Sequence, residues 1–392
     1  MTVAMTDLEK ATLERTAQAG ISALQRGDGA AARAAFESIV ASGRATPQIW
    51  LWLAQACDIL DDRAAVMAHV ARVVEGDPAN PYALVMAGEV QTRSGNDRAA
   101  IAWYERALTA AQGRQLPPDL IARLKRAAAE RETAFARFEA GMMGALGDAG
   151  IDPAAASPRF AEALQIVSGR SQPYLQQPTS FYYPRLPQVP FYDPADFAWT
   201  EALTAALPAI RAEAEAVMAH GDGIAPYVEA DPDRPNKGHA LLADARWSAF
   251  HLFRDGQPIA EHSARCPATM AALAQAPMPS IVGTAPMALF SILAPHTHIP
   301  PHHGMLNTRL ICHLPLIVPD GCRLRVGGEI RDVRAGEVLL FDDSIEHEAW
   351  NDSDAPRAIL LFEVWRPELT VAERQALTVM FETVAAYTPH QA

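Results

Sequence analysis

The spacing of hydrophobic and polar positions changes at about residue 170. Before that point, apolar and small residues recur every three to four positions, as in "LIARLKRAAAERETAFARFEAGMMGAL" (residues 120–146), which is typical of amphipathic helices. Beyond it, short runs rich in β-branched and aromatic residues, such as "MALFSILA" and "RAILLFEVW", alternate with Gly, Pro and Asp turns. The pattern predicts a helical N-terminal part and a C-terminal part built from closely spaced strands, as in a small barrel or jelly roll.

The helical part contains internal repeats. The segments "GDGAAARAAFESIV", "DDRAAVMAHVARVV" and "NDRAAIAWYERALTAA" place Asp28, Asp62 and Asp97 at intervals of 34 and 35 residues, and Pro47 and Pro81 are also 34 residues apart. This period resembles the tetratricopeptide repeat, in which each unit is a helical hairpin that buries one face against its neighbours. We expect such a repeat domain over residues 1–140. The alternative is an alanine-rich helical bundle without a binding groove.

A segment rich in proline and tyrosine separates the two parts. Residues 172–196 read "QPYLQQPTSFYYPRLPQVPFYDPAD", which excludes a helix or a central strand because proline lacks the backbone donor. The segment is either a flexible linker or a strap packed over the next domain, and its aromatic residues favour the strap. We expect a helical and Pro/Tyr-rich linker over residues 141–180, a helix over Trp199–His220 and a β domain over residues 181–392.

Composition narrows the classes of function. The net charge is −13 without a cluster of Lys and Arg, which argues against a nucleic-acid partner. No signal-peptide core and no run of eighteen uncharged apolar residues is present, so we expect a cytoplasmic protein without a membrane partner. The four cysteines are widely spread without a CxxC pair, which favours small buried residues over disulfides or a zinc site.

Candidate catalytic and metal-binding residues are concentrated between residues 296 and 347, a stretch that holds six of the twelve histidines. On a strand, Asn307, Arg309, Ile311 and His313 share one side, while Leu310, Cys312 and Leu314 share the other. One face is thus largely polar and the other apolar, as a barrel with a working interior requires. Arg357 enters an apolar strand, where a guanidinium needs an anion to offset its desolvation. A dicarboxylate cosubstrate would fit.

Two long motifs, "PHHGMLNTRL" and "FDDSIEHEAW", resemble the aspartyl/asparaginyl β-hydroxylase family of iron(II)- and 2-oxoglutarate-dependent oxygenases over roughly residues 181–369. The resemblance implies a double-stranded β-helix with flanking helices. It also implies hydroxylation of an aspartyl, asparaginyl or related residue by O2, with succinate and CO2 as coproducts. Tetratricopeptide-like helices also precede the oxygenase domain in eukaryotic members of the family.

The resemblance assigns roles to individual residues. His302 and His347 would be the catalytic iron ligands, and Gly304 would replace the usual carboxylate ligand and leave that position open. Arg357 and Ser291 would bind the distal carboxylate of 2-oxoglutarate, with His313 beside the proximal one.

Arg309 and Asn307 would lie near the substrate, whereas Ile311 stands where the family usually has a second arginine. This departure leaves open a substrate other than aspartate or asparagine. Asp342 and Asp343 would support the site without binding the metal. Glu346 and Glu348 should point away from the face of His347.

Several alternatives remain at this stage. The helical repeats favour a peptide or protein substrate, but a free or carrier-bound amino acid is also compatible with the sequence. A non-catalytic scaffold with a vestigial barrel would lack turnover although His302, His347 and Arg357 are present. A cupin-like metal isomerase or hydrolase would need more protein ligands than the strand phase supplies. Neither of these last two would produce succinate.

Overall fold

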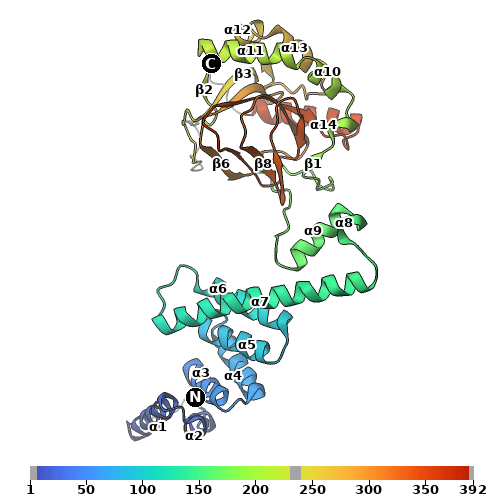
Figure 1. Cartoon of the computed structure of the whole chain (residues 1–392). Coiled ribbons are helices and arrows are strands. Elements are labelled where there is room, and N and C mark those ends of the chain that lie inside the picture. Colours follow the sequence, from blue (N-terminus) through green and yellow to red (C-terminus); the bar gives the residue numbers. More distant parts are fainter. Residues whose placement is uncertain (1–6, 230–239, 388–392) are drawn as a thin grey trace. The chain divides into compact units, whose positions relative to one another are not determined.

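The computed structural model describes residues 7–229 and 240–387. The chain divides into two compact units, the first ending at Ser171 and the second beginning at Gln172 (Figure 1). This division falls inside the segment 141–180 that we expected to be a linker. Helix α7 continues past residue 140 to Asp148, so the first unit includes part of that segment. Within the described ranges, none of the helices combines the length and apolar character that a membrane crossing needs.

The first unit consists of helical hairpins. Helix α1 packs on α2, α3 on α4 and α5 on α6, and α7 packs against α5 and α6. The helices are α1 Asp7–Gln25, α2 Gly29–Ala41, α3 Pro47–Ile59, α4 Arg63–Gly76, α5 Pro81–Arg93, α6 Asp97–Ala111, α7 Pro118–Asp148, α8 Pro153–Ala156 and α9 Pro158–Val167. The prediction of tetratricopeptide-like repeats is confirmed.

The repeat period is set by helix caps. Asp28, Asp62 and Asn96 cap the second helix of each hairpin, and each side chain accepts a hydrogen bond from the backbone N–H three residues later, at 3.0, 3.1 and 3.2 Å. Each such cap stabilises its helix by about 1 kcal/mol. The third cap is Asn96 rather than Asp97, whose carboxylate pairs with Arg137 instead. The structural period is therefore 34 residues in both intervals.

Small residues let the paired helices approach closely. Gly88 on α5 lies against the ring of Tyr104 on α6, and a Cβ atom at residue 88 would collide with that ring. Gly20 on α1 faces Phe36 on α2 in the same way. Tyr104 and Phe36 are fully buried, so the glycines form the flat surface that each large ring needs.

The second unit contains two antiparallel sheets. The first has the strand order β1-β10-β7-β12-β5-β3-β2, with β4 paired to β3, and the second has the order β6-β11-β8-β9. The strands are β1 Phe191–Tyr192, β2 Ala225–Pro226, β3 Trp247–Arg254, β4 Gln257–Pro258, β5 Ala288–Leu293, β6 Thr297–His302, β7 Arg309–Ile317, β8 Cys322–Val326, β9 Glu329–Asp332, β10 Leu339–Phe341, β11 His347–Asn351 and β12 Arg357–Trp365.

The sheets pack face to face through one apolar cluster. Leu289, Ile359 and Leu361 of the first sheet contact the cluster from one side, and Ile299 and Leu324 of the second sheet contact it from the other. Crossing antiparallel sheets of this kind form a double-stranded β-helix, so the predicted fold class is confirmed.

Helices cover the outer face of the first sheet (Figure 1). They are α10 Trp199–Ala205, α11 Leu207–His220, α12 Ala260–Ala264 and α13 Pro267–Leu273; a short 3-10 turn, Pro194–Asp196, precedes them and α14 Val371–Ala386 follows the last strand. The single helix expected over Trp199–His220 is two helices that meet at Ala206, because Pro208 cannot donate within a continuous helix.

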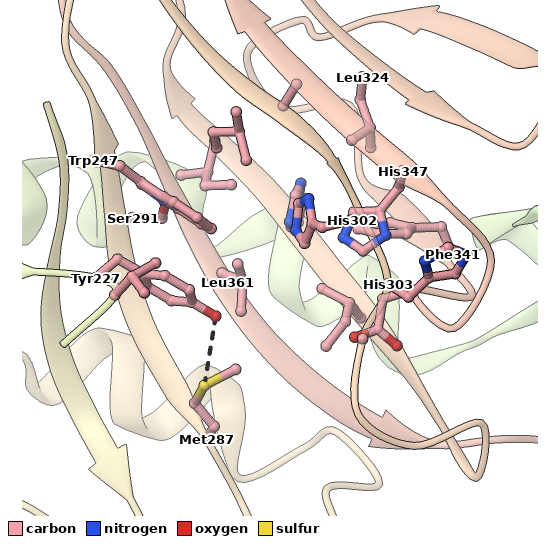
Figure 2. A pocket seen from close by; sticks show the side chains of 18 of the residues that line it. Tyr227, Trp247, Met287, Ser291, His302, His303, Leu324, Phe341, His347 and Leu361 are labelled. Carbon is pink, nitrogen blue, oxygen red and sulfur yellow. Dashed lines mark hydrogen bonds between the residues drawn. The ribbon is translucent and has the colours of Figure 1, made fainter. Parts of the chain in front are cut away.

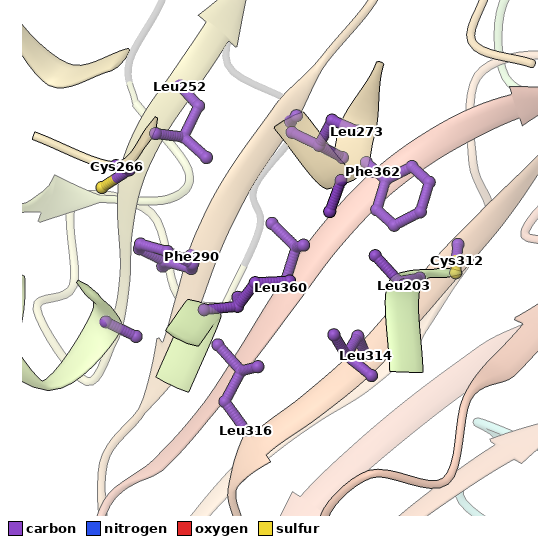
Figure 3. Packing of buried hydrophobic residues seen from close by; sticks show 14 of the residues in the cluster. Leu203, Leu252, Cys266, Leu273, Phe290, Cys312, Leu314, Leu316, Leu360 and Phe362 are labelled. Carbon is purple, nitrogen blue, oxygen red and sulfur yellow. The ribbon is translucent and has the colours of Figure 1, made fainter. Parts of the chain in front are cut away.

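Strand β7 alternates as expected. Cys312, Leu314 and Leu316 point into the cluster beneath the helices, together with Phe290 and Phe362 of neighbouring strands (Figure 3). The alternate residues of β7 therefore face the space between the sheets. The four cysteines are buried and free, as predicted.

Candidate active site

A cavity of about 300 Å³ lies between the two sheets (Figure 2). Its walls carry apolar side chains from both sheets, with polar groups at a few positions. Six of the seven predicted site residues line it: Ser291, His302, Arg309, His313, His347 and Arg357.

His302 and His347 face each other across two neighbouring strands (Figure 2). They are partners in the register of β6 and β11, and their ring centroids are 4.1 Å apart. Nδ1 of His302 lies 2.8 Å from the carbonyl oxygen of Pro300, and Nδ1 of His347 lies 3.1 Å from that of Ile345. Since a carbonyl only accepts, Nδ1 is the protonated nitrogen in both rings, and Nε2 carries the lone pair that a metal would bind. Burial lowers the pKa of His347, which keeps its ring neutral at pH 7.

The space beside Gly304, where a side chain of residue 304 would lie, is occupied by another segment. The carboxyl of Asp343 occupies the space where a Cβ atom of residue 304 would lie, and the Gly304 N–H donates to the Asp343 carbonyl at 2.7 Å. Burial raises the pKa of Asp343 to about 7. Within the described part of the chain, its Oδ1 atom has no hydrogen-bond partner. The Asp343 carboxyl thus borders the cavity beside Gly304, which is two residues after His302 in the sequence, although Asp343 itself belongs to another segment.

Arg357 is a buried cation at the start of β12. The residue is 2% exposed, and burial lowers the pKa of its guanidinium to about 10. Among the described residues, its Nε has no hydrogen-bond partner and no carboxylate lies within ion-pairing distance. Ser291 lies on the adjacent strand β5, where its Oγ accepts a hydrogen bond from Trp247 Nε1 at 3.1 Å. The charge of Arg357 is therefore open to an anion entering the cavity.

His313 is buried on the same wall. Its ring meets Phe341 edge to face at 4.9 Å, and burial followed by the charge of Arg357 lowers its pKa well below 6.5. It therefore offers a neutral imidazole to the cavity.

Arg309, in contrast, already has a partner. It forms an ion pair with Glu363, which is fully buried on β12 and also accepts a hydrogen bond from the Met287 N–H at 2.9 Å. Ile311 beside it is 6% exposed and adds an apolar group to the wall. The remaining apolar lining includes Val228, Ile299, Leu324, Ile359 and Leu361.

Asn307 is not among the lining residues. It is fully buried, and its amide donates to Gln176 Oε1 at 3.0 Å and to the Tyr183 carbonyl at 2.8 Å, while its Oδ1 accepts from the Tyr183 N–H at 2.6 Å. The side chain thus holds the Pro/Tyr-rich segment in place, and the structure gives no support to the substrate role that we expected for it.

Glu346 and Glu348 lie away from the histidine pair, as their strand phase indicated. Both carboxylates bind Arg325 on strand β8, and Glu348 also contacts His298 at 2.7 Å. These contacts form a charged cluster outside the cavity lining.

Sequence reasoning did not find Tyr227 and Trp247. Their rings stack at 4.1 Å and form one wall of the cavity, and Tyr227 directs its hydroxyl towards Met287 Sδ at 4.0 Å (Figure 2). Both residues lie more than fifty positions before the histidine motif, so nothing local in the sequence connects them to it.

Comparison with known proteins agrees with this site. Residues 204–367 match the family model of aspartyl/asparaginyl beta-hydroxylase. The chain is 34% identical over 188 residues to an ornithine lipid ester-linked acyl 2-hydroxylase of Rhizobium tropici, covering 47% of this chain and 63% of that protein. It is also 34% identical over 193 residues to human aspartyl/asparaginyl beta-hydroxylase, covering 48% of this chain and 24% of that protein. Residues 204–367 of the second unit thus resemble the aspartyl/asparaginyl β-hydroxylase family, and the predicted resemblance is confirmed.

The chain spans less than two thirds of each of these relatives. Among solved structures, PcrH from Pseudomonas aeruginosa covers 33% of this chain and 95% of its own length, at 19% identity and a TM-score of 0.30. The cupin domain of an XRE-family transcriptional regulator from Enterobacter cloacae covers 21% of this chain and 82% of its own, at 15% identity and a TM-score of 0.19. These scores are low, and the fold assignment rests on the helix and strand pairing described above.

Proposed function

We propose that the second unit is an iron(II)- and 2-oxoglutarate-dependent dioxygenase that hydroxylates an unactivated carbon. The observation that carries this proposal is the uncompensated charge of Arg357, buried in the same cavity as the His302–His347 pair. A buried guanidinium without a counter-ion is costly, and a carboxylate cosubstrate would remove that cost.

The residues present fit the metal and the cosubstrate. The Nε2 atoms of His302 and His347 would hold iron, and each Nδ1–H is fixed by a backbone carbonyl, as is common for metal-binding histidines. Arg357 and the Ser291 hydroxyl would bind the distal carboxylate of 2-oxoglutarate. His313 would lie beside the proximal carboxylate.

When bound, iron with 2-oxoglutarate activates O2 and inserts oxygen into a C–H bond, with succinate and CO2 as coproducts. The chain contributes position and environment. The apolar wall of Ile299, Leu324 and Leu361 excludes water, which strengthens the attraction between Arg357 and its anion. The carboxyl of Asp343 would accept or hold a proton next to the metal position.

The first candidate substrate is an aspartyl, asparaginyl or related residue of a peptide or protein. Paired helical repeats present extended surfaces that suit such a segment, and the relatives include human aspartyl/asparaginyl beta-hydroxylase. The first unit would then supply binding and the second unit the chemistry.

A second candidate is an uncharged, aliphatic group such as an acyl chain. Arg309 is already paired with Glu363, and Ile311 adds an apolar group where a second cation would otherwise stand. After Arg357 has bound the cosubstrate, a substrate carboxylate would find no uncompensated cation among the described lining residues. The relative named as an acyl 2-hydroxylase is consistent with this candidate.

The test of the site is an anaerobic titration with iron(II) and 2-oxoglutarate, monitored through the visible metal-to-ligand charge-transfer band. We expect a band that needs both additives, disappears in His302→Ala and in His347→Ala, and persists in His298→Ala. His298 is a matched control because it lies on the same strand as His302 but contacts Glu348 outside the cavity. A folded wild-type chain without the band would refute the oxygenase and favour the non-catalytic scaffold.

The test of the substrate is succinate formation with two matched panels. One panel holds peptides that carry Asp, Asn or Leu at a single position, and the other holds acyl amides of increasing length. Preference for the Asp or Asn peptides supports the first candidate. Turnover that rises with apolar chain length supports the second.

A further inference from the structure

The Pro/Tyr-rich strap, residues 172–192, binds both segments that carry the histidine pair. The Gln177 N–H donates to the Ser344 carbonyl at 2.7 Å, just before His347 in the sequence. The Thr179 and Phe181 N–H groups donate to the carbonyls of Gly304 and Met305 at 2.9 and 3.0 Å, just after His302. The strap ends as β1, which pairs with β10.

Gln176 is the strap residue that connects the two segments through its side chain. It is 7% exposed, and its Nε2 donates to Asp342 Oδ2 at 2.7 Å and to the Pro187 carbonyl at 2.9 Å. Its Oε1 accepts from Asn307 Nδ2 at 3.0 Å. Asn307 follows the His302 segment and Asp342 begins the His347 segment, so one amide bridges the two.

Asp342 transmits this contact to the turn before His347. The residue is fully buried, and its Oδ1 accepts hydrogen bonds from the N–H and the hydroxyl of Ser344 at 3.0 and 2.5 Å. Its Oδ2 accepts from Gln176 and from Arg366, the latter at 2.6 Å. Arg366 is fully buried as well, so this network lies in a low-dielectric interior where each hydrogen bond has a large effect.

We propose that Gln176 is a positioning residue that sets the distance and orientation of His302 and His347 from the strap. The inference rests on the proposed function. With His302 and His347 as the proposed metal ligands, small displacements of either segment change the geometry that the metal meets, and residues behind the ligands control such displacements. The segment that joins the two units is by this inference part of the metal site.

The test compares Gln176→Met with Gln177→Met. Both changes remove a glutamine amide from the strap, but the Gln177 side chain is exposed and its backbone N–H is kept in the variant. Methionine fills the volume of glutamine, so packing changes little. Two properties are measured in the full chain: the Kd for Co(II) in the presence of 2-oxoglutarate, and the hydrogen exchange of the Gly304 and Ser344 amides without metal.

We expect Gln176→Met to raise the Kd for Co(II) about tenfold, as for other residues that support metal ligands. Exchange of the Gly304 and Ser344 amides should accelerate, since the Ser344 N–H donates to Asp342 and the Gly304 N–H to the Asp343 carbonyl. Gln177→Met should match the wild type in both properties. If Gln176→Met does not fold, Gln176→Asn, which keeps the amide but shortens its reach, takes its place.

A Kd for Gln176→Met within twofold of the wild-type value would overturn the proposal, whether or not exchange at the two amides changes. A wild-type chain that binds no metal would instead refute the proposed function, and the positioning role would fall with it.

Discussion

Replacing Arg357 by methionine should stabilise the metal-free second unit. The guanidinium is 2% exposed, and its burial lowers the pKa from 12.5 to about 10. At about 1.4 kcal/mol per pKa unit, that difference means that keeping the charge in the folded state costs roughly 3 kcal/mol at pH 7. Methionine keeps most of the apolar stem without the charge. We therefore expect the free energy of unfolding to rise by about 2 kcal/mol after a small loss of packing.

The assay is urea unfolding followed by pulsed hydrogen exchange and mass spectrometry, in which peptides from β12 report the second unit alone. Arg309→Met is the matched control, because that cation has a buried partner in Glu363 and its removal should destabilise the unit by about 3 kcal/mol. Saturating 2-oxoglutarate with anaerobic iron(II) should stabilise the wild type and leave Arg357→Met unchanged. A less stable Arg357→Met unit in the absence of ligand would refute the reasoning.

Three further changes test other parts of the fold. Asp343→Asn should equal the metal-free wild type near pH 4 and exceed its stability by about 4 kcal/mol above pH 7. Burial raises the pKa of this carboxyl from 3.8 to about 7, so at about 1.4 kcal/mol per pKa unit the folded wild type loses stability as the pH rises between these values; urea titrations at the two pH values check this, and a constant difference contradicts it. Arg309→Met combined with Glu363→Met should be more stable than either single variant in the same assay, and an additive loss would show that the two residues do not interact. Gly88→Ala should destabilise the first unit by about 2 kcal/mol because its Cβ meets the Tyr104 ring, and an unchanged thermal transition would disagree.

The features that the sequence predicted are those with a local signature. The 34-residue period marks each hairpin because caps and small residues recur at fixed offsets. The alternation along β7 separates the helix-covered face from the cavity face, so the side of His313 followed from strand geometry alone. The pairing of His302 with His347 followed from the family motifs, which record contacts that no local pattern contains.

The features that the sequence did not predict depend on long-range contacts. Gly304 shows only that this position carries no side chain, and nothing near it in the sequence indicates that the carboxyl of Asp343, thirty-nine residues away, lies beside it. Asn307 has the strand phase of a cavity residue, yet its amide turns towards Gln176 in the strap. In both cases a segment distant in the sequence determines the surroundings of the residue. The alternation of polar and apolar positions along one strand carries no information about such a distant segment.

The evenly spaced caps of the first unit have a consequence for how this chain can vary. Removing residues 62–95 would join Asp61 to Asn96, so one capping residue would take the place of another and the following helix would begin in the same phase. A gain of 34 residues at the same point would likewise add one complete hairpin. The length of the solenoid is thus an adjustable property, which insertion or loss of whole hairpins can change without altering any residue around the cavity.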